Sequence, residues 1–144
     1  MSFLIVDLTV KNKIQEKKVL IGIDIIDLKK IQIIERKDSI MQRLFTPVEL
    51  DSVGDFDHRK RITILASIFA GKEAAVKALG TGFNDIISVQ DIQIKIERYN
   101  KGKVEFLGEA KKLVDEMGIV KTQFSFDAGK NIVVAAVILE TRKY

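Results

Sequence analysis

The sequence predicts an α+β fold in which an antiparallel sheet packs against one long helix and several shorter helices. The order of the elements and the length of the chain lead to this prediction. Helical patterns fill most of the stretch from 28 to 79, and alternating segments joined by short turns fill most of the remainder. Helices followed by hairpins are typical of α+β proteins, whereas a parallel sheet needs strands and helices in regular alternation. The 144 residues are expected to form a single domain.

The N-terminal part predicts two strands and a helix. Residues 3–10 are largely apolar and predict a strand, and residues 11–18 predict a polar connector. Val19–Ile26 is short, apolar and rich in β-branched residues, which indicates a buried strand. From Leu28 to about Arg36 apolar residues recur every three or four positions, so we expect a helix there.

Two further helices are predicted from their capping signals. Thr46 and Glu49 form a capping box with a proline between them, so a short helix is expected from Thr46 toward Val53. A long helix is expected over 58–79, and Gly80 after it suits a left-handed cap. Apolar residues mark one face of the long helix, namely Ile62, Leu65, Phe69, Val76 and Leu79.

The C-terminal half predicts two hairpins separated by one helix. The expected segments are a strand at 91–97, a turn at 100–103, a strand at 104–107, a helix at 109–117, and strands at 123–127 and 132–140 joined by a turn at 128–131. In the first strand Ile92, Ile94 and Ile96 alternate with other residues, which is typical of a sheet with one buried face.

The composition excludes several classes of protein. The absence of cysteine excludes a disulfide scaffold, a thiol nucleophile and cysteine-ligated metal sites. The single histidine, His58, excludes a histidine-rich metal site. No apolar run approaches the roughly 20 residues that cross a bilayer, so we expect no membrane partner. The net charge of +4 favours an acidic partner without naming one.

Two carboxylates stand where apolar residues are expected. On the long helix Glu73 lies about 40° from Phe69, inside the apolar stripe. Asp24 interrupts the buried strand, where aspartate is disfavoured. Each needs a partner, a metal or a proton, because an unpaired buried charge is costly. Together they indicate a shared hard cation, and Mg²⁺ is usually held by one or two carboxylates plus substrate phosphates.

Simpler interpretations of both carboxylates stay open. Glu73 would lie at the edge of the stripe and pair with Lys77 one turn later. Asp24 would follow a strand that ends near Ile23 and cap the next element.

The surroundings of Glu73 contain groups that suit phosphates. Lys72 precedes it, Lys77 follows it, and Gly80–Gly82 comes next, where glycines let backbone amides approach a ligand. On its own, such a glycine pair usually marks only the end of a helix. The basic cluster His58–Arg61 is either an anion contact or a solvated basic turn.

Three segments resemble holo-acyl-carrier-protein synthase, the small type of 4′-phosphopantetheinyl transferase. Gly22–Leu28 is similar to its Gly-Ile-Asp-Ile-Val-Glu-Ile signature, and Arg43–Leu50 to its Arg-x-Phe-Thr-x-x-Glu segment. Phe69–Gly82 is close to its most specific motif, Phe-Ala-Ala-Lys-Glu-Ala-x-x-Lys-Ala-x-Gly-Thr-Gly. The resemblance runs from about residue 20 to 141, and residues 1–18 form an N-terminal extension of unassigned role.

The resemblance implies a reaction and a set of site residues. The family transfers 4′-phosphopantetheine from coenzyme A to a serine of apo-acyl carrier protein and releases adenosine 3′,5′-bisphosphate, a step of fatty acid biosynthesis. By position, Asp24 and Glu73 are implied to hold Mg²⁺, Glu73 to take the serine proton, and Lys72 to add positive charge beside the phosphates. The residues implied to bind coenzyme A are Lys60, Lys77, Gly80, Thr81, Gly82 and Ser125.

The resemblance also implies partners, and the sequence departs from the family pattern at several positions. Lys30 and Arg43 match positions that meet the acidic helix of the carrier, and members of this type resemble homotrimers with active sites between subunits. A histidine of the last family motif is replaced by Ala128, and an arginine before Phe69 is replaced by Ile68.

These departures leave an alternative function open, a non-catalytic homologue that binds coenzyme A or a carrier protein. A nucleic-acid-binding module is not expected, because the chain has no tryptophan and only 2 tyrosines for stacking on bases. We expect a cytoplasmic protein, or an organellar one if a targeting segment was removed upstream.

Overall fold

The computed structural model describes residues 4–12 and 15–142. Its elements are β1 Leu4–Asn12, β2 Gln15–Asp27, α1 Leu28–Ile34, α2 Asp38–Leu44, α3 Pro47–Ser52, α4 His58–Leu79, the 3₁₀ turn η1 Val89–Asp91, β3 Ile92–Ile96, β4 Lys101–Phe106, α5 Gly108–Glu116, β5 Ile119–Ala128 and β6 Ile132–Thr141. The strands form one six-stranded sheet in the order β1-β2-β6-β5-β4-β3. All neighbouring strands are antiparallel, so the predicted α+β class is confirmed.

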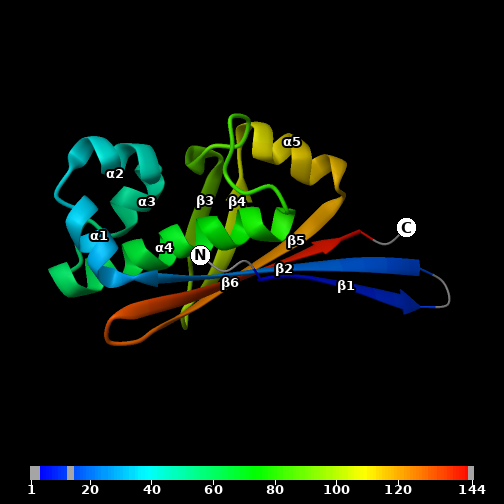
Figure 1. The fold of residues 1–144 in the computed structure, drawn as a ribbon, viewed down its shortest axis with the longest axis horizontal. Coiled ribbons are helices and arrows are strands. Elements are labelled where there is room, and N and C mark those ends of the chain that lie inside the picture. The colour runs from blue at the N-terminus through cyan, green and yellow to red at the C-terminus, as the bar shows by residue number, and fades with distance from the viewer. Residues whose placement is uncertain (1–3, 13–14, 143–144) are drawn as a thin grey trace.

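The long helix α4 lies across the sheet and packs mainly against β2 and β6 (Figure 1). Figure 1 shows α1, α2 and α3 gathered at one end of α4, with α5 toward the other end of the sheet. Alternate residues of β6 are buried under the helix, among them Val133, Ala135, Val137 and Leu139. The residues between them face the other side of the sheet and are only partly buried.

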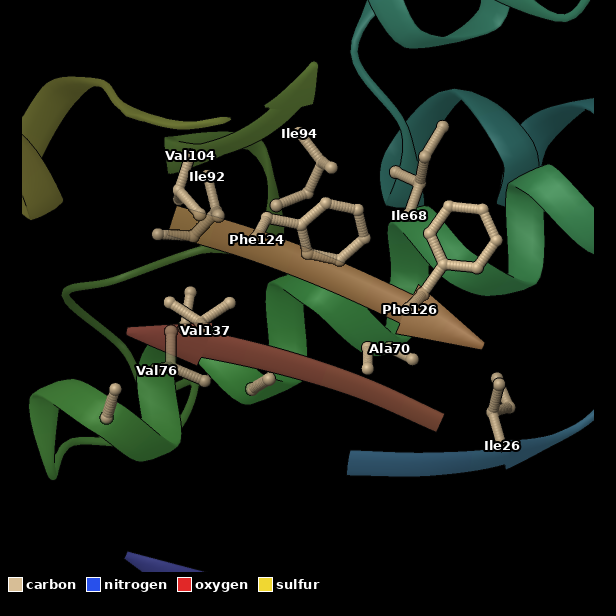
Figure 2. Packing of buried hydrophobic residues seen from close by; sticks show 14 of the residues in the cluster. Ile26, Ile68, Ala70, Val76, Ile92, Ile94, Val104, Phe124, Phe126 and Val137 are labelled. Atoms are coloured by element: carbon tan, nitrogen blue, oxygen red, sulfur yellow. The ribbon is translucent and has the colours of Figure 1, made fainter. Parts of the chain in front are cut away.

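The hydrophobic core lies between α4 and the inner face of the sheet. Figure 2 shows Phe124 and Phe126 of β5 between Ile94 of β3 and the helix residues Ile68 and Ala70. The two phenylalanine rings stack with centroids 5.8 Å apart. This packing fixes the rotation of α4, and with it the direction of every charged side chain on the helix.

The predicted capping signals are confirmed. The Thr46 side chain accepts from the Glu49 backbone N–H, and the Glu49 carboxylate accepts from the Thr46 N–H, so α3 begins with a capping box. Helix α4 spans the predicted residues and ends at Gly80, whose φ of 81° is left-handed.

Some expected boundaries are wrong. Residues 11–18 do not form a polar connector, because Lys11 and Asn12 complete β1 and β2 begins at Gln15; residues 3 and 13–14 lie outside the described residues. The turn expected at 100–103 comes earlier, with left-handed Tyr99 and Asn100 before β4 begins at Lys101. Helix α2 was not expected from the sequence.

Candidate functional site

Asp24 lies in the interior of β2, opposite Ala135 of β6, and its side chain points toward α4. The strand continues to Asp27, so the interpretation that it ends near Ile23 is wrong, and Asp27 caps α1 instead. The Lys77 ammonium donates to Oδ1 of Asp24 at 2.7 Å, and both side chains are almost fully buried. The Asp24 carboxylate is therefore fixed and its charge balanced.

Gly22 explains why Asp24 approaches α4 so closely. A Cβ atom on Gly22 would lie 1.8 Å from the carbonyl oxygen of Ala74 and 2.8 Å from the nitrogen of Ala78. No residue with a side chain fits against the helix backbone at this point. Gly22 thus sets the distance between β2 and α4, two residues before the carboxylate.

Glu73 faces the same region from α4, one turn before Lys77, and is half-buried. Burial raises the pKa of its carboxyl above the ordinary value, the charge of Asp24 raises this pKa further, and Lys77 and Lys30 act in the opposite direction. Glu73 is partly exposed, as the simpler interpretation expects; Lys77 forms its ion pair with Asp24 and acts on Glu73 through its charge. Among the described residues, Glu73 makes no hydrogen bond or ion pair.

Asp24 and Glu73 line one open cavity of about 450 Å³ at the junction of β2, α1 and α4. Lys29 and Lys30 of α1 line its basic side, and apolar walls come from residues such as Ile33 and Phe69. The cavity thus combines three carboxylates, those of Asp24, Asp27 and Glu73, with the exposed ammonium groups of Lys29 and Lys30. Such a place suits a ligand with both negative charges and an apolar arm.

The cavity has the donor set for a hard cation but lacks a complete cage. Within the described part of the chain, no group of three or more His, Cys, Asp and Glu side chains could hold a metal ion. One oxygen of Asp24 and the Glu73 carboxylate fit the arrangement in which one or two carboxylates bind Mg²⁺ and the substrate supplies further oxygens.

Lys72 lies outside this cavity, which corrects the expectation that it acts beside the phosphates. Its ammonium is fully buried, 2.6 Å from Oε1 of Glu49, and donates to the carbonyls of Leu44 at 2.8 Å and Val89 at 3.2 Å. Burial lowers the pKa of Lys72, and Glu49 opposes this decrease. All three N–H groups of the ammonium have acceptors in the interior, so none reaches a ligand in this structure.

The Gly80–Gly82 segment also lies apart from the two carboxylates. The N–H groups of Thr81 and Gly82 donate to the carbonyl of Val76, so they close the helix. Thr81 lines a separate cavity of about 280 Å³, formed with Asn84 and α5. In this chain the segment therefore acts as the end of α4.

Lys60 and Ser125 line two other cavities. Lys60 lies 4.1 Å above the ring of Phe56, beside a cavity of about 420 Å³ that Arg98 and Tyr99 also line. It precedes Glu73 by thirteen positions, which places the two about 20 Å apart along α4 and about 140° apart around it. Ser125 is exposed on the face of β5 opposite the two buried phenylalanines, in a cavity of about 350 Å³.

The two residues expected to meet a carrier lie on the helical end of the molecule. Lys30 is exposed on α1 and lines the carboxylate cavity, and Arg43 is exposed on the last turn of α2. Three residues of this region are not predicted from the sequence in the roles that the structure gives them, namely Gly22, Glu49 as the partner of Lys72, and Gln90. Gly22, two residues before Asp24, is the local signal in the sequence for the close approach of β2 to α4.

Two of the residues that depart from the family pattern, Ile68 and Ala128, do not line the carboxylate cavity. Ile68 is buried in the core, so its side chain belongs to the packing of α4 rather than to a cavity. Ala128 is exposed at the end of β5.

Among residues 4–12 and 15–142, no helix has the length and apolar character that a membrane span requires.

Comparison with known proteins gives consistent matches. A family model of the 4′-phosphopantetheinyl transferase superfamily matches residues 20–137. A holo-[acyl-carrier-protein] synthase of Geotalea daltonii is 36% identical over 121 residues, which cover 83% of this chain and 95% of that protein. The crystal structure of the holo-[acyl-carrier-protein] synthase of Neisseria meningitidis has a TM-score of 0.72 at 30% identity and covers 83% of this chain and 95% of its own.

A further structure adds a ligand. The holo-(acyl-carrier-protein) synthase of Bacillus anthracis, solved in complex with CoA (3′,5′-ADP), has a TM-score of 0.68 at 29% identity over 85% of this chain and 96% of its own. The sequence match covers the segments that carry Asp24, Glu49 and the long helix. The chain belongs to the 4′-phosphopantetheinyl transferase superfamily.

Proposed function

We propose that the protein is a Mg²⁺-dependent holo-acyl-carrier-protein synthase, which transfers 4′-phosphopantetheine from coenzyme A to a serine of apo-acyl carrier protein and releases adenosine 3′,5′-bisphosphate. The observation that carries the proposal is the meeting of Asp24 and Glu73 in one cavity beside Lys30. Family membership supplies the reaction type, and the resemblance suggests fatty acid biosynthesis as its setting. A cysteine-free chain suits the reducing cytoplasm.

In the proposed reaction the serine oxygen attacks the phosphorus that carries the pantetheine arm. A new O–P bond forms, the bridging P–O bond of the pyrophosphate breaks, and adenosine 3′,5′-bisphosphate departs with the bridging oxygen. Glu73, which lines the cavity on the same side as Asp24, is the group that accepts the serine proton. Lys77 keeps Asp24 in place rather than contacting a phosphate itself.

Asp24 and Glu73 would hold Mg²⁺ together with oxygens of the pyrophosphate. The bound ion would neutralise negative charge on the phosphoryl group and on the leaving group. The protein residues around it orient the two carboxylates, with Gly22 setting the approach of β2 and Lys77 fixing one oxygen of Asp24.

We also propose a homotrimer in which neighbouring subunits complete each site. Lys60 and Ser125 point away from the carboxylate cavity of their own chain, so they would bind the nucleotide end of coenzyme A in the site of another copy. The sheet face opposite α4 is apolar enough for such an assembly. The residues on it are Ile21 and Ile23 of β2 and Val134, Ala136 and Ile138 of β6.

The carrier is proposed to dock with its acidic helix against α1 and α2. Lys30 and Arg43 present exposed positive charge on these two helices, and Lys30 reaches the edge of the cavity. Charge complementarity of this kind speeds association, and rising salt weakens it.

The decisive experiment incubates the protein with Mg²⁺, coenzyme A and several apo-carriers, and then measures the mass of each carrier. We expect a gain of one phosphopantetheine in at least one carrier, strongly reduced by Glu73→Gln. The matched control is Glu116→Gln, which changes an exposed glutamate of α5 in the same way. No gain with any carrier would contradict transfer and favour the alternative of a non-catalytic binding protein.

A second experiment tests the assembly. Ile23→Asp places a charge on the sheet face opposite α4 and should convert trimers to monomers in analytical ultracentrifugation, with loss of transfer. Ile86→Asp places the same charge on an isoleucine that is 68% exposed in a loop, and should leave the mass unchanged. A trimer that survives Ile23→Asp, or a wild-type protein that sediments as a monomer, would contradict the proposed assembly.

A further inference from the structure

The C-terminal end of α2 is held from outside by the side chain of Gln90. The last carbonyls of a helix have no partner within it. The Gln90 amide donates from Nε2 to the carbonyl oxygens of Gln42 at 2.8 Å, Arg43 at 3.1 Å and Phe45 at 2.9 Å. Because an amide has two N–H groups, at least one of them is shared between two carbonyls.

The remaining carbonyl of this turn is held by the buried lysine described above. Leu44 accepts from Lys72 at 2.8 Å, so four successive carbonyls receive hydrogen bonds from two side chains of other elements. Residue 89, which precedes Gln90, is also bonded to Lys72 through its carbonyl. The two anchors therefore support one another as well as α2.

The 3₁₀ turn η1, which carries Gln90, is itself fixed by hydrogen bonds. The backbone N–H of Ser88, the N-cap of η1, donates to the Asp91 carboxylate at 3.0 Å, and the N–H of Leu107 donates to the Asp91 carbonyl at 2.8 Å. Helix α2 has seven residues, too few to be stable alone in water. The direction of its last turn therefore depends on these outside donors.

We propose that Gln90 is a positioning residue for carrier binding, which fixes the end of α2 and thereby the direction of Arg43. The proposal rests on the proposed function, in which Arg43 meets the acidic carrier. Gln90 bonds the backbone carbonyl of Arg43 itself, while the arginine side chain stays exposed. Gln90 acts through Arg43 and does not contact coenzyme A or the carrier.

The chain offers a matched pair of glutamines for the test. Gln93, three residues later, donates to the Glu105 carboxylate on the sheet at 2.8 Å and, among the described residues, forms no hydrogen bond to α2. Gln90→Glu keeps the size of the side chain but removes the N–H donors and places a charge among carbonyl oxygens. Gln90→Leu removes all polarity, and Gln93→Leu applies that change at the control position.

The assay measures steady-state kinetics with apo-carrier and coenzyme A varied separately. For both Gln90 variants we expect the KM for the carrier to rise about tenfold, with kcat and the KM for coenzyme A within about twofold of wild type. In an Arg43→Ala background, Gln90→Leu should raise the carrier KM less than about twofold further, because the two residues act as one unit. Gln93→Leu should leave all three parameters unchanged.

Amide hydrogen exchange of the carrier-free protein gives a readout that does not depend on activity. Exchange of the α2 amides should increase in the Gln90 variants and not in Gln93→Leu. If a Gln90 variant unfolds, Gln90→Asn, which shortens the reach of the same amide, replaces it. An active wild type whose carrier KM is unaffected by Gln90 substitution would overturn this inference, whereas an inactive wild type would overturn the proposed function.

Discussion

The buried pair of Lys72 and Glu49 allows a sharp stability prediction. Lys72→Met keeps the length and shape of the side-chain stem, with sulfur in place of Cδ, and removes the ammonium. The Glu49 carboxylate then stays in the interior without its counter-charge, accepting only the N–H groups of Thr46 and Ile94, each at 2.8 Å. The carbonyls of Leu44 and Val89 lose a donor as well.

The magnitude follows from the geometry of the pair. The two charges lie 2.6 Å apart with both side chains fully buried, and breaking such a pair costs about 3–5 kcal/mol. A domain is stable by about 5–15 kcal/mol, so Lys72→Met is expected to remove a large part of this. Adding Glu49→Gln to Lys72→Met should recover about 1 kcal/mol or more, because a neutral amide is less costly to bury than a lone carboxylate.

The assay is urea unfolding at one fixed protein concentration, since the proposed assembly would make the midpoint depend on concentration. The control is Lys112→Met on α5, which breaks an ion pair with Glu109 that lies at the surface and should barely move the midpoint. A loss below about 1 kcal/mol for Lys72→Met would refute the reasoning, as would a double variant no more stable than Lys72→Met.

Three further outcomes follow from the site. Burial and the charge of Asp24 raise the pKa of Glu73 in the folded protein. Between the pKa of Glu73 in the unfolded chain and its higher pKa in the folded protein, the folded state therefore binds more protons. The free energy of unfolding consequently falls as the pH rises through this range. Without divalent metal, Glu73→Gln should therefore raise Tm at pH 7 and not at pH 4; equal shifts at both pH values would contradict the pKa shift. Gly22→Ala should separate β2 from α4 and lower both stability and transfer, measured by thermal melting and carrier mass. Gly54→Ala should do neither, because a Cβ atom there would lie 3.5 Å from the carbonyl oxygen of Asp51, an ordinary van der Waals distance. Mg²⁺ and coenzyme A should each tighten the binding of the other by the same factor in calorimetry, because each completes the site of the other; independent affinities would contradict the shared site.

The parts of the fold that the sequence predicts well are those with strong local signals. The long helix has an apolar stripe over many turns and a glycine at its end, and α3 has a complete capping box. Helix α2 has no such signal, because its last turn is satisfied by Gln90 and Lys72 from distant parts of the chain. The early start of β2 is not predicted, because the first residues of the strand, such as Lys17, are polar and lie beyond the hydrophobic core. There Lys17 forms an ion pair with Glu140 of β6.

The site shows the same division between local and tertiary causes. Asp24 and Glu73 were predicted to meet because each is a carboxylate in an apolar pattern, and both line one cavity. Lys72 was assigned to that cavity because it is next to Glu73 in sequence. Neighbours on a helix point about 100° apart, so adjacency argues against a shared cavity, whereas the four-residue spacing of Glu73 and Lys77 places both toward β2. The partner of Lys72 comes from α3, which no helical pattern on α4 identifies.

The charged residues of the long helix therefore divide into two kinds. Lys72 and Lys77 point about 140° apart around α4 and bind different elements, one through Glu49 of α3 and the other through Asp24 of β2. Buried ion pairs of this kind add little net stability, but each fixes one relative position of the elements that it joins. The helix is therefore held from two sides. Of the charged residues in the motif Phe69–Gly82, only Glu73, which lies between the two lysines in sequence, lines the cavity. The two lysines position the helix, and through it Glu73, which we propose is the group of the motif that binds and reacts.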